Sequence, residues 1–517
     1  MRKNDKWRKI DNGAVLNAYP DSMGGTLGDI VALLQKSEFE NAFHSFYILP
    51  SLFHSDLDRG FSVIDYQLNT LLATEKDLED LRKCGISLKL DFVLNHLSVQ
   101  SPQFQNLLLN GEASPYKDFF IEWNKFWNNY GVMTDEGYIQ PYPSLIENMF
   151  FRKPGLPILM VHMPNGENVP YWNTFYQKVS SDSNKKQYLG QMDLNIKSPL
   201  VWDFYKNTLQ TLAGYGADIV RLDAFAYAPK EPGKHNFLNI PDTWDLLERV
   251  RKIADGYEVN LLPEIHASYA EKIYLQLAQK GYMTYDFFLP GLILDAFERK
   301  QGALLISWAQ EQRKNGIHVI NMLGCHDGIP LLDLKGLVPD AQIEKLIDTV
   351  VKRGGYVKNL HGQKNIYYQV NATYYSALGE NDRKMLLARA IQLFMPGKPQ
   401  VWYLDLFAGT NDYKAVEKFG EGGHKEINRT NLTIRQITDA LKKDVVQKQL
   451  HLLRWRNTFP AFGFETEMLA EQPTNETIRI MWKQNKYIAV LEANLATEAF
   501  SVYGKKHNKV VFFMEES

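Results

Sequence analysis

The feature that most constrains the fold is a helix-like stretch followed by a short apolar run, a pairing that recurs along the chain. The four clearest pairs are 74–85 with 86–96, 199–216 with 217–225, 242–258 with 259–265, and 302–316 with 317–328. Repeated helix-then-strand units imply parallel strands joined by crossover helices. At this length we expect an α/β fold with a (β/α)8 TIM barrel. The alternative is an open doubly wound sheet. We would expect a Gly-rich nucleotide-binding loop in such a fold, and the sequence lacks one.

Three stretches break this rhythm. Residues 97–192 are rich in aromatic residues, Asn, Pro and Gly, and are too long for a plain loop, so we expect an inserted domain B. Residues 328–379 form a second insertion, domain B′, and 467–517 read as short strands that form a small C-terminal β domain. The barrel itself is then expected from 1–96, 193–327 and 380–466.

Composition excludes several classes of protein. A net charge of −2 provides no field for nucleic acid or an anionic membrane. The chain has two cysteines and no Cys/His cluster with zinc-like spacing, so we expect neither a disulfide framework nor a metal or other cofactor. No apolar run is long enough to span a membrane, and the basic N-terminus leads into no signal-peptide pattern. A cytoplasmic enzyme is the expectation.

Polar residues lie at the ends of four expected strands, at positions where a buried core would favour apolar residues. They are Asp91, Asn95 and His96; Arg221 and Asp223; Glu264 and His266; and His326 and Asp327. In a TIM barrel the carboxyl ends of the strands form the floor of the active site. A spacing of two places Arg221 and Asp223 on the same side of their strand, so both can face one site.

Three carboxylates at one floor suggest glycosidic bond chemistry with retention of configuration. Such transfer needs an ionised carboxylate that attacks the anomeric carbon and a protonated one that serves the leaving oxygen. We expect Arg221 to lower the pKa of Asp223, which makes Asp223 the nucleophile. Glu264 follows apolar residues and suits the acid. Asp327 would then stabilise positive charge on the sugar ring.

The motifs "DFVLNH", "VRLDA", "LLPEIH" and "CHDG" resemble, in order, the signature regions of glycoside hydrolase family 13, the α-amylase superfamily. The stretches "AYPDSMGG", "DRGFSVIDY", "RKPGLP", "YYQVNATYYSALGEND" and "EINR" look like its sucrose phosphorylase branch. The resemblance implies a barrel with two inserted domains and a C-terminal β domain. It also implies double displacement through a β-glucosyl enzyme, from which inorganic phosphate takes the glucose as α-glucose 1-phosphate.

Carried over by motif, the resemblance makes Asp223 the nucleophile, Glu264 the acid/base and Asp327 the stabiliser of the transition state. It further implies contacts to the glucosyl unit from Arg221, His96 and His326, a clamp of Asp58 and Arg429, and apolar walls from Phe61 and Phe175.

On the acceptor side, the resemblance points to Arg152 or Lys153 for phosphate and to Tyr368 and Gln369 for the leaving group. The sequence departs from sucrose phosphorylases just before this pair. They usually carry an Asp there, but this chain has Ile366 and Tyr367. The loss weakens the case for fructose and leaves room for glycerol, glycerate or a phosphorylated sugar. His424 and Lys425 could meet an anionic acceptor, although we interpret them as part of a solvated loop.

We therefore expect a retaining phosphorylase for a sucrose-like α-glucoside. The alternatives are a phosphorylase of glucosylglycerol, glucosylglycerate or sucrose 6′-phosphate, and a retaining α-glucosidase or transglucosidase. A non-catalytic binding subunit is disfavoured because all three carboxylates are present. The expected partners are small-molecule substrates, with no nucleic acid and no membrane, and relatives of this kind often form homodimers.

Overall fold

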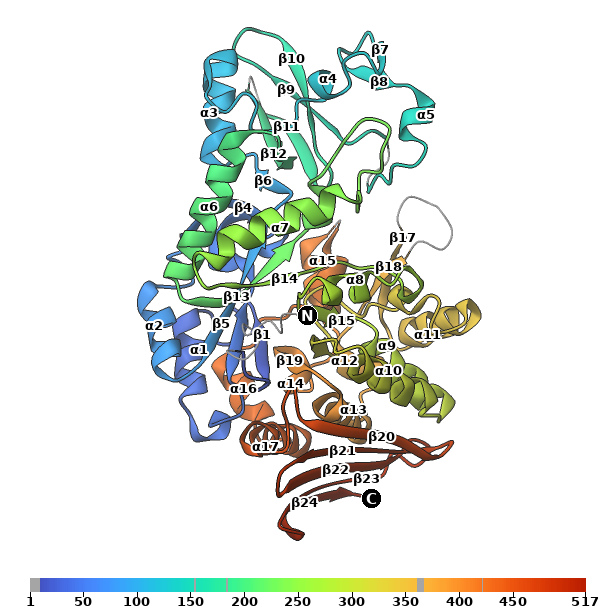
Figure 1. Cartoon of the computed structure of the whole chain (residues 1–517). Helices are drawn as coiled ribbons and strands as arrows, with labels where there is room; N and C mark the ends of the chain where they lie inside the picture. Colours follow the sequence, from blue (N-terminus) through green and yellow to red (C-terminus); the bar gives the residue numbers. More distant parts are fainter. Residues whose placement is uncertain (1–9, 153–154, 183–184, 360–366, 421) are drawn as a thin grey trace.

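A barrel of parallel strands forms the centre of the computed structural model, which describes residues 10–152, 155–182, 185–359, 367–420 and 422–517 (Figure 1). Its eight strands are β1 (Val15–Ala18), β2 (Ser45–Ile48), β5 (Ser87–Val93), β13 (Ala217–Asp223), β14 (Asn260–Pro263), β15 (Thr284–Asp286), β16 (Val319–Met322) and β19 (Lys398–Trp402). The predicted TIM barrel is confirmed.

The strands follow the order β14-β13-β5-β2-β1-β19-β16-β15, and every neighbouring pair is parallel. The pairing of β1 with β19 joins the first strand of the barrel to the last. The seam lies between β14 and β15, which share no ladder of hydrogen bonds among the described strands. The barrel is therefore nearly closed.

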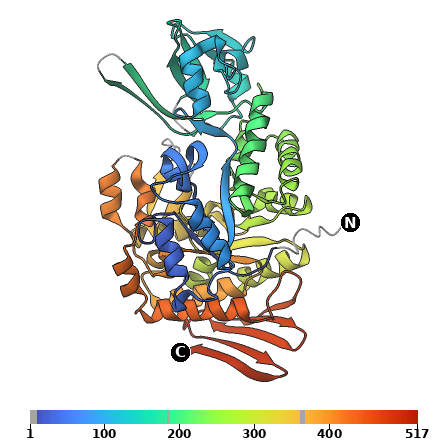
Figure 2. The same ribbon diagram turned by 90° about the vertical axis from the view of Figure 1, so that its left-hand side faces the viewer.

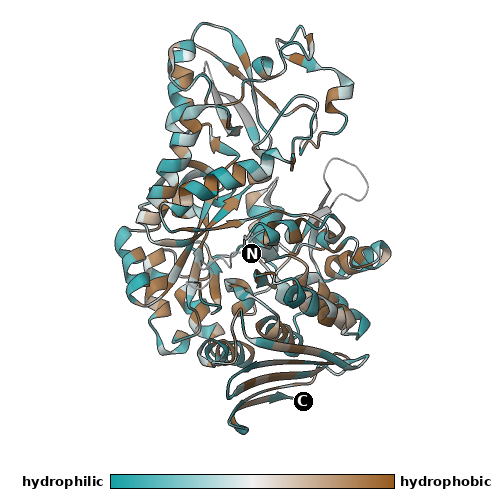
Figure 3. Ribbon diagram, in the orientation of Figure 1, coloured by the Kyte–Doolittle hydropathy of each residue, from teal (hydrophilic) through white to brown (hydrophobic). Residues whose placement is uncertain are grey.

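Helices cover the outside of the barrel, and hydrophilic and hydrophobic stretches alternate along them (Figure 3). The four helices expected from the sequence are present: α2 (Glu75–Lys83), α6 (Pro199–Gly214), α7 (Asp242–Asp255) and α10 (Ala303–Lys314). Thr74 caps α2, because its side chain accepts a hydrogen bond from the Asp77 backbone while Asp77 reaches back to the Thr74 backbone. This reciprocal cap fixes where the helix begins.

The polar positions of β5 do not face solvent. Lys89 and Asp91 are only 1% and 0% exposed, although they alternate with apolar residues in the sequence. Such alternation is typical of a sheet with one wet face. In a closed barrel it separates inward from outward positions instead, and both are covered. Lys89 and Asp91 therefore occupy the interior of the barrel.

Two long excursions leave the barrel on the side of its strand ends. The first runs between β5 and β13 and contains β6 (His96–Ser98), β9 (Ile158–His162), β10 (Asn168–Trp172), β11 (Gln177–Asp182) and β12 (Lys185–Asp193). Both views show it as a separate lobe on one side of the barrel (Figures 1 and 2). The second runs between β16 and β19 and contains η8 (Leu332–Leu334), α11 (Asp340–Lys352), β17 (Tyr356–Asn359) and β18 (Tyr367–Asn371). The domain boundaries given above stay a prediction.

An antiparallel sheet follows the last barrel helix, α17 (Asp444–Thr458), and agrees with the expected C-terminal β structure. Its strands are β20 (Glu467–Thr474), β21 (Thr477–Gln484), β22 (Tyr487–Asn494), β23 (Phe500–Lys506) and β24 (Lys509–Glu516), paired in chain order. Trp455 of α17 stacks on Phe512 with ring centroids 4.3 Å apart. The weakest strand pattern is that of β20, because most of its residues are exposed and half of them are polar.

Neither a membrane span nor a metal cluster is found in the described part of the chain. No helix there is long and apolar enough to cross a bilayer. No group of three or more His, Cys, Asp and Glu side chains is arranged to hold a metal ion among those residues.

Candidate active site

Arg221, near the end of β13, connects the carboxylates of three neighbouring strands. Its Nη1 donates to Oδ1 of Asp91 at 2.6 Å and to Oδ1 of Asp223 at 2.9 Å. Its Nη2 lies 3.4 Å from Oε1 of Glu264, which directly follows β14. Because one planar guanidinium serves both, Asp223 and Glu264 are neighbours. The arginine is 3% exposed, so water screens these ion pairs little.

The electrostatics of this pair differ from the expectation. Burial raises the pKa of Asp223, and Arg221 only partly offsets this effect. Burial acts on Glu264 in the same direction, but Arg221 and His266 outweigh it and hold the pKa of Glu264 below its usual value. Arg221 does lower the pKa of Asp223, as expected from the sequence, but burial outweighs this effect, so the pKa of Asp223 lies above its usual value and not below it.

Asp327 lies in the loop after β16, close to His326 and to two cations, Lys425 and Arg429. Its Oδ2 is 3.1 Å from Nε2 of His326, and its Oδ1 is 2.6 Å from Nζ of Lys425 and 3.7 Å from Nη2 of Arg429. Burial alone would raise the pKa of Asp327, but His326, Lys425 and Arg429 hold it well below its usual value. Asp327 is therefore a permanent negative charge beside the pair.

Asp58 and Arg429 form an ion pair across the same pocket, with Nη1 and Oδ1 3.3 Å apart. Asp58 and Arg59 both have a φ of 47°, and the chain between β3 (Phe53–Leu57) and β4 (Ser62–Leu68) turns sharply there. A Cβ on Gly60 would lie 2.1 Å from the Ser51 backbone nitrogen, so the turn requires glycine. Arg59 donates to the Arg429 carbonyl at 2.7 Å and so links the turn that carries Asp58 to the segment that carries Arg429.

Aromatic rings lie beside these charges. Phe61 stacks on His326 with ring centroids 5.0 Å apart and an angle of 11°. The ring of Phe175 lies 4.9 Å from that of His96, whose Nε2 is 3.0 Å from the Phe61 carbonyl oxygen. The structure thus brings together all the residues predicted to contact the glucosyl unit.

The predicted acceptor residues lie in the two excursions. The Arg152 guanidinium lies over the Phe175 ring at 4.9 Å from its centroid, and its Nη1 donates to the Tyr227 hydroxyl at 3.0 Å. Gln369, on β18, places its Nε2 3.1 Å from Nε2 of His266. Lys153 and the side chain of Tyr368 lie outside the described residues.

Sequence reasoning undervalued two residues of this site and missed a third. Lys425 does not belong to a solvated loop: the 3-10 helix η9 (Gly423–Asn428) brings it onto Asp327. The sequence assigns no role to His266, yet its two ring nitrogens contact Glu264 and Asp333. Asp333 was missed because it lies five positions after the CHDG motif and belongs to no motif. The spacing of two between Glu264 and His266 was the available signal.

Comparisons with known proteins agree with this geometry. The model of the α-amylase catalytic domain matches residues 17–323. A protein of Ilumatobacter coccineus named sucrose 6(F)-phosphate phosphorylase is 52% identical over 503 residues, which cover 95% of this chain and 96% of that protein. A sucrose phosphorylase of Streptococcus mutans is 33% identical over 502 residues, covering 95% of this chain and 98% of that protein.

A solved structure is also similar over its whole length. The crystal structure of sucrose 6F-phosphate phosphorylase from Thermoanaerobacter thermosaccharolyticum superposes with a TM-score of 0.89 at 33% identity, covering 99% of both chains. The chain belongs to the α-amylase family, glycoside hydrolase family 13. It is an enzyme of the phosphorylase type within that family.

Proposed function

We propose that this enzyme is a retaining phosphorylase of sucrose 6F-phosphate, in which the phosphate is carried by C6 of the fructosyl unit. The products would be α-glucose 1-phosphate and fructose 6-phosphate. The observation that carries the proposal is the 52% identity, over 95% of this chain, with the protein named for that activity. The sequence alternative of a phosphorylated sugar is thereby preferred to sucrose itself.

The proposed first half-reaction transfers the glucosyl unit to the enzyme. The Asp223 carboxylate attacks the anomeric carbon, and the bond from that carbon to the fructosyl oxygen breaks. Glu264 gives a proton to the departing oxygen, so that fructose 6-phosphate leaves as a neutral alcohol at that position. Asp327, held ionised by its neighbouring cations, stabilises the positive charge on the ring.

In the second half-reaction, a phosphate oxygen attacks the same carbon from the face that the leaving group vacated. The ester to Asp223 breaks, and Glu264 takes the proton that phosphate loses. Two inversions give net retention. Asp58 and Arg429 would hold the far hydroxyls of the glucosyl unit, while Phe61 and Phe175 would cover its apolar faces.

Charge on the acceptor side supports an anionic leaving group. Arg152 lies over the Phe175 ring, and Lys425 of η9 reaches Asp327. The position that is usually acidic in sucrose phosphorylases is occupied by Ile366 in this sequence. A carboxylate there would repel a phosphorylated fructosyl unit, whereas the cations Arg152 and Lys425 favour it.

The synthetic direction tests the proposal directly. The enzyme is incubated with α-glucose 1-phosphate and, separately, fructose, fructose 6-phosphate, glycerol and glycerate, and phosphate release is measured. Fructose 6-phosphate should exceed each other acceptor by at least about tenfold, the effect of one lost charge-assisted contact. A preference for any other acceptor would overturn the proposed substrate, and equally fast glucose release without an acceptor would identify a hydrolase.

A further inference from the structure

Three buried side chains form a line that ends on the proposed acid, Glu264. Nε2 of His266 lies 3.2 Å from Oε1 of Glu264, and Nδ1 of the same ring lies 3.2 Å from Oδ1 of Asp333. The exposed fractions of these side chains are 13% for Glu264, 6% for His266 and 4% for Asp333. The imidazole therefore bridges two carboxylates in a place that water hardly reaches.

Separate parts of the fold hold this line in place. Glu264 and His266 follow β14, two residues apart, whereas Asp333 comes from η8 in the excursion after β16. The ring of Phe287, which follows β15, stacks on the His266 ring at 3.9 Å between centroids and an angle of 22°. The stacking fixes the plane of the imidazole, so each nitrogen keeps its own carboxylate.

A fourth group gives Nε2 of His266 a partner in either protonation state. Nε2 of Gln369 lies 3.1 Å from it. A protonated Nε2 donates to the Glu264 carboxylate. An unprotonated Nε2 accepts from the Gln369 amide, while Nδ1–H still donates to Asp333. The site can therefore hold the ring with or without the proton on Nε2.

Charges around the ring favour the protonated state of His266. Burial lowers the pKa of His266, but Asp333 and Glu264 outweigh it and raise the pKa to about 10. Arg221, Asp223 and Asp327 act on the same unit through Glu264. The proton is thus favoured on the imidazole, between the two carboxylates, over the Glu264 carboxylate.

We propose that His266 and Asp333 are positioning residues that load Glu264 with the proton for the leaving group. In this step the Nε2–H bond of the imidazolium breaks and an O–H bond forms on Oε1 of Glu264, which leaves both groups neutral. Glu264 passes this proton to the leaving oxygen, regains one from the incoming phosphate, and returns it to His266. The inference rests on the proposed function, because it assumes that Glu264 is the acid.

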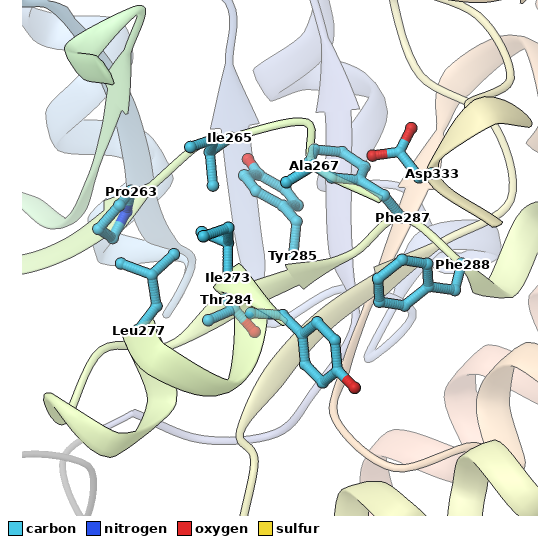
Figure 4. A pocket seen from close by; sticks show the side chains of 11 residues that line it. Pro263, Ile265, Ala267, Ile273, Leu277, Thr284, Tyr285, Phe287, Phe288 and Asp333 are labelled. Carbon is cyan, nitrogen blue, oxygen red and sulfur yellow. The ribbon is translucent and has the colours of Figure 1, made fainter. Parts of the chain in front are cut away.

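A small cavity behind residues 264–267 leaves room for this proton exchange between His266 and Glu264. Ile265 and Ala267, on either side of His266, line a cavity of about 20 Å³ together with Phe287 and Asp333 (Figure 4). The other lining residues include Pro263 and Tyr285, so the cavity lies at the seam between β14 and β15. Small shifts of the loop between the two hydrogen-bonding arrangements need no repacking of a filled core.

The test compares donors that differ in their need for an acid. The best natural donor of the wild type requires a proton on its leaving oxygen, whereas α-glucosyl fluoride does not. Asp333→Asn should lower kcat/KM for the natural donor by about tenfold or more, and His266→Gln by about 10²-fold, with α-glucosyl fluoride changed less than about threefold. Asp333→Asn should also move the alkaline limb of the pH profile down by about 1–3 pH units.

Asp295→Asn is the matched control. Asp295 lies in α9 (Leu289–Arg299), is 2% exposed and pairs with Arg299, so this variant removes a buried carboxylate that is not part of the Glu264–His266–Asp333 line. Its rates and pH profile should match the wild type. Equal losses for both donors in both variants, or an alkaline limb that stays in place, would overturn the relay. Wild-type specificity for another acceptor would overturn the proposed substrate alone, and a wild type that cleaves neither donor would overturn both.

Discussion

The carboxylates of the proposed glucosyl pocket lie on the barrel, whereas the residues of the proposed acceptor side lie in the two excursions. In the glucosyl pocket, Arg221, Asp223 and Glu264 lie at the ends of adjacent strands and are held by ion pairs. On the acceptor side, Arg152 and Gln369 lie in the two excursions. Strand ends keep reacting groups in place, whereas loops can vary without disturbing the core. One barrel can thus keep its glucosyl chemistry while its leaving group changes.

The strongest test of the strand-end pocket is Asp223→Asn. An amide cannot form the glucosyl ester, so transfer from every donor should fall by at least about 10⁴-fold. The measurement is kcat/KM for the natural donor and for α-glucosyl fluoride, with the melting temperature as a check of folding. A folded variant that keeps substantial activity would contradict the proposed role of Asp223 as the nucleophile.

Glu264→Gln distinguishes donors whose leaving group needs a proton from donors whose leaving group does not. Natural donors should lose about 10²–10⁴-fold in kcat/KM, because their leaving oxygen goes unprotonated. α-Glucosyl fluoride should lose less than about tenfold, because fluoride needs no acid. If steady-state rates with the two donors fell to the same extent, another residue would be the acid.

The pH profile of kcat/KM reports both groups in the free enzyme. Asp223 must be ionised to attack, and burial raises its pKa, so activity should disappear as the pH falls through a value above the usual aspartate range. The proton on the His266–Glu264 unit must be present, so activity should also disappear as the pH rises through about 10. Each unit beyond a limb should cost about tenfold. An acid limb near pH 4 would contradict the raised pKa of Asp223.

The smallest expected effect concerns the loops. Arg152→Met should raise KM for an anionic acceptor by about tenfold, because one charge-assisted contact is lost, and should leave cleavage of α-glucosyl fluoride unchanged. Arg249→Met is the matched control, because Arg249, on the outer helix α7, lies over Trp202 of α6. If Arg152→Met slowed both reactions alike, Arg152 would serve the glucosyl pocket instead of the acceptor.

Much of the fold and of the glucosyl pocket could be predicted from the chain alone. Helix-then-strand units, such as the one that Thr74 caps, specify a parallel barrel through local patterns. Strand-end positions such as Arg221 and Asp223 are visible because charge interrupts an apolar run. The strand β20 is harder to recognise from the sequence. Most of its residues are exposed and half of them are polar, so no apolar run marks it.

The sequence by itself determined the barrel and the chemical types that face its floor, because both follow from local periodicity. Only the tertiary structure decided how these groups share charge. Arg221 divides its attraction among Asp91, Asp223 and Glu264, and Lys425 reaches Asp327 from nearly a hundred positions away. Asp333 and His266 meet although they lie 67 positions apart. Protonation depends on distance and burial in space, and neither can be read along the chain.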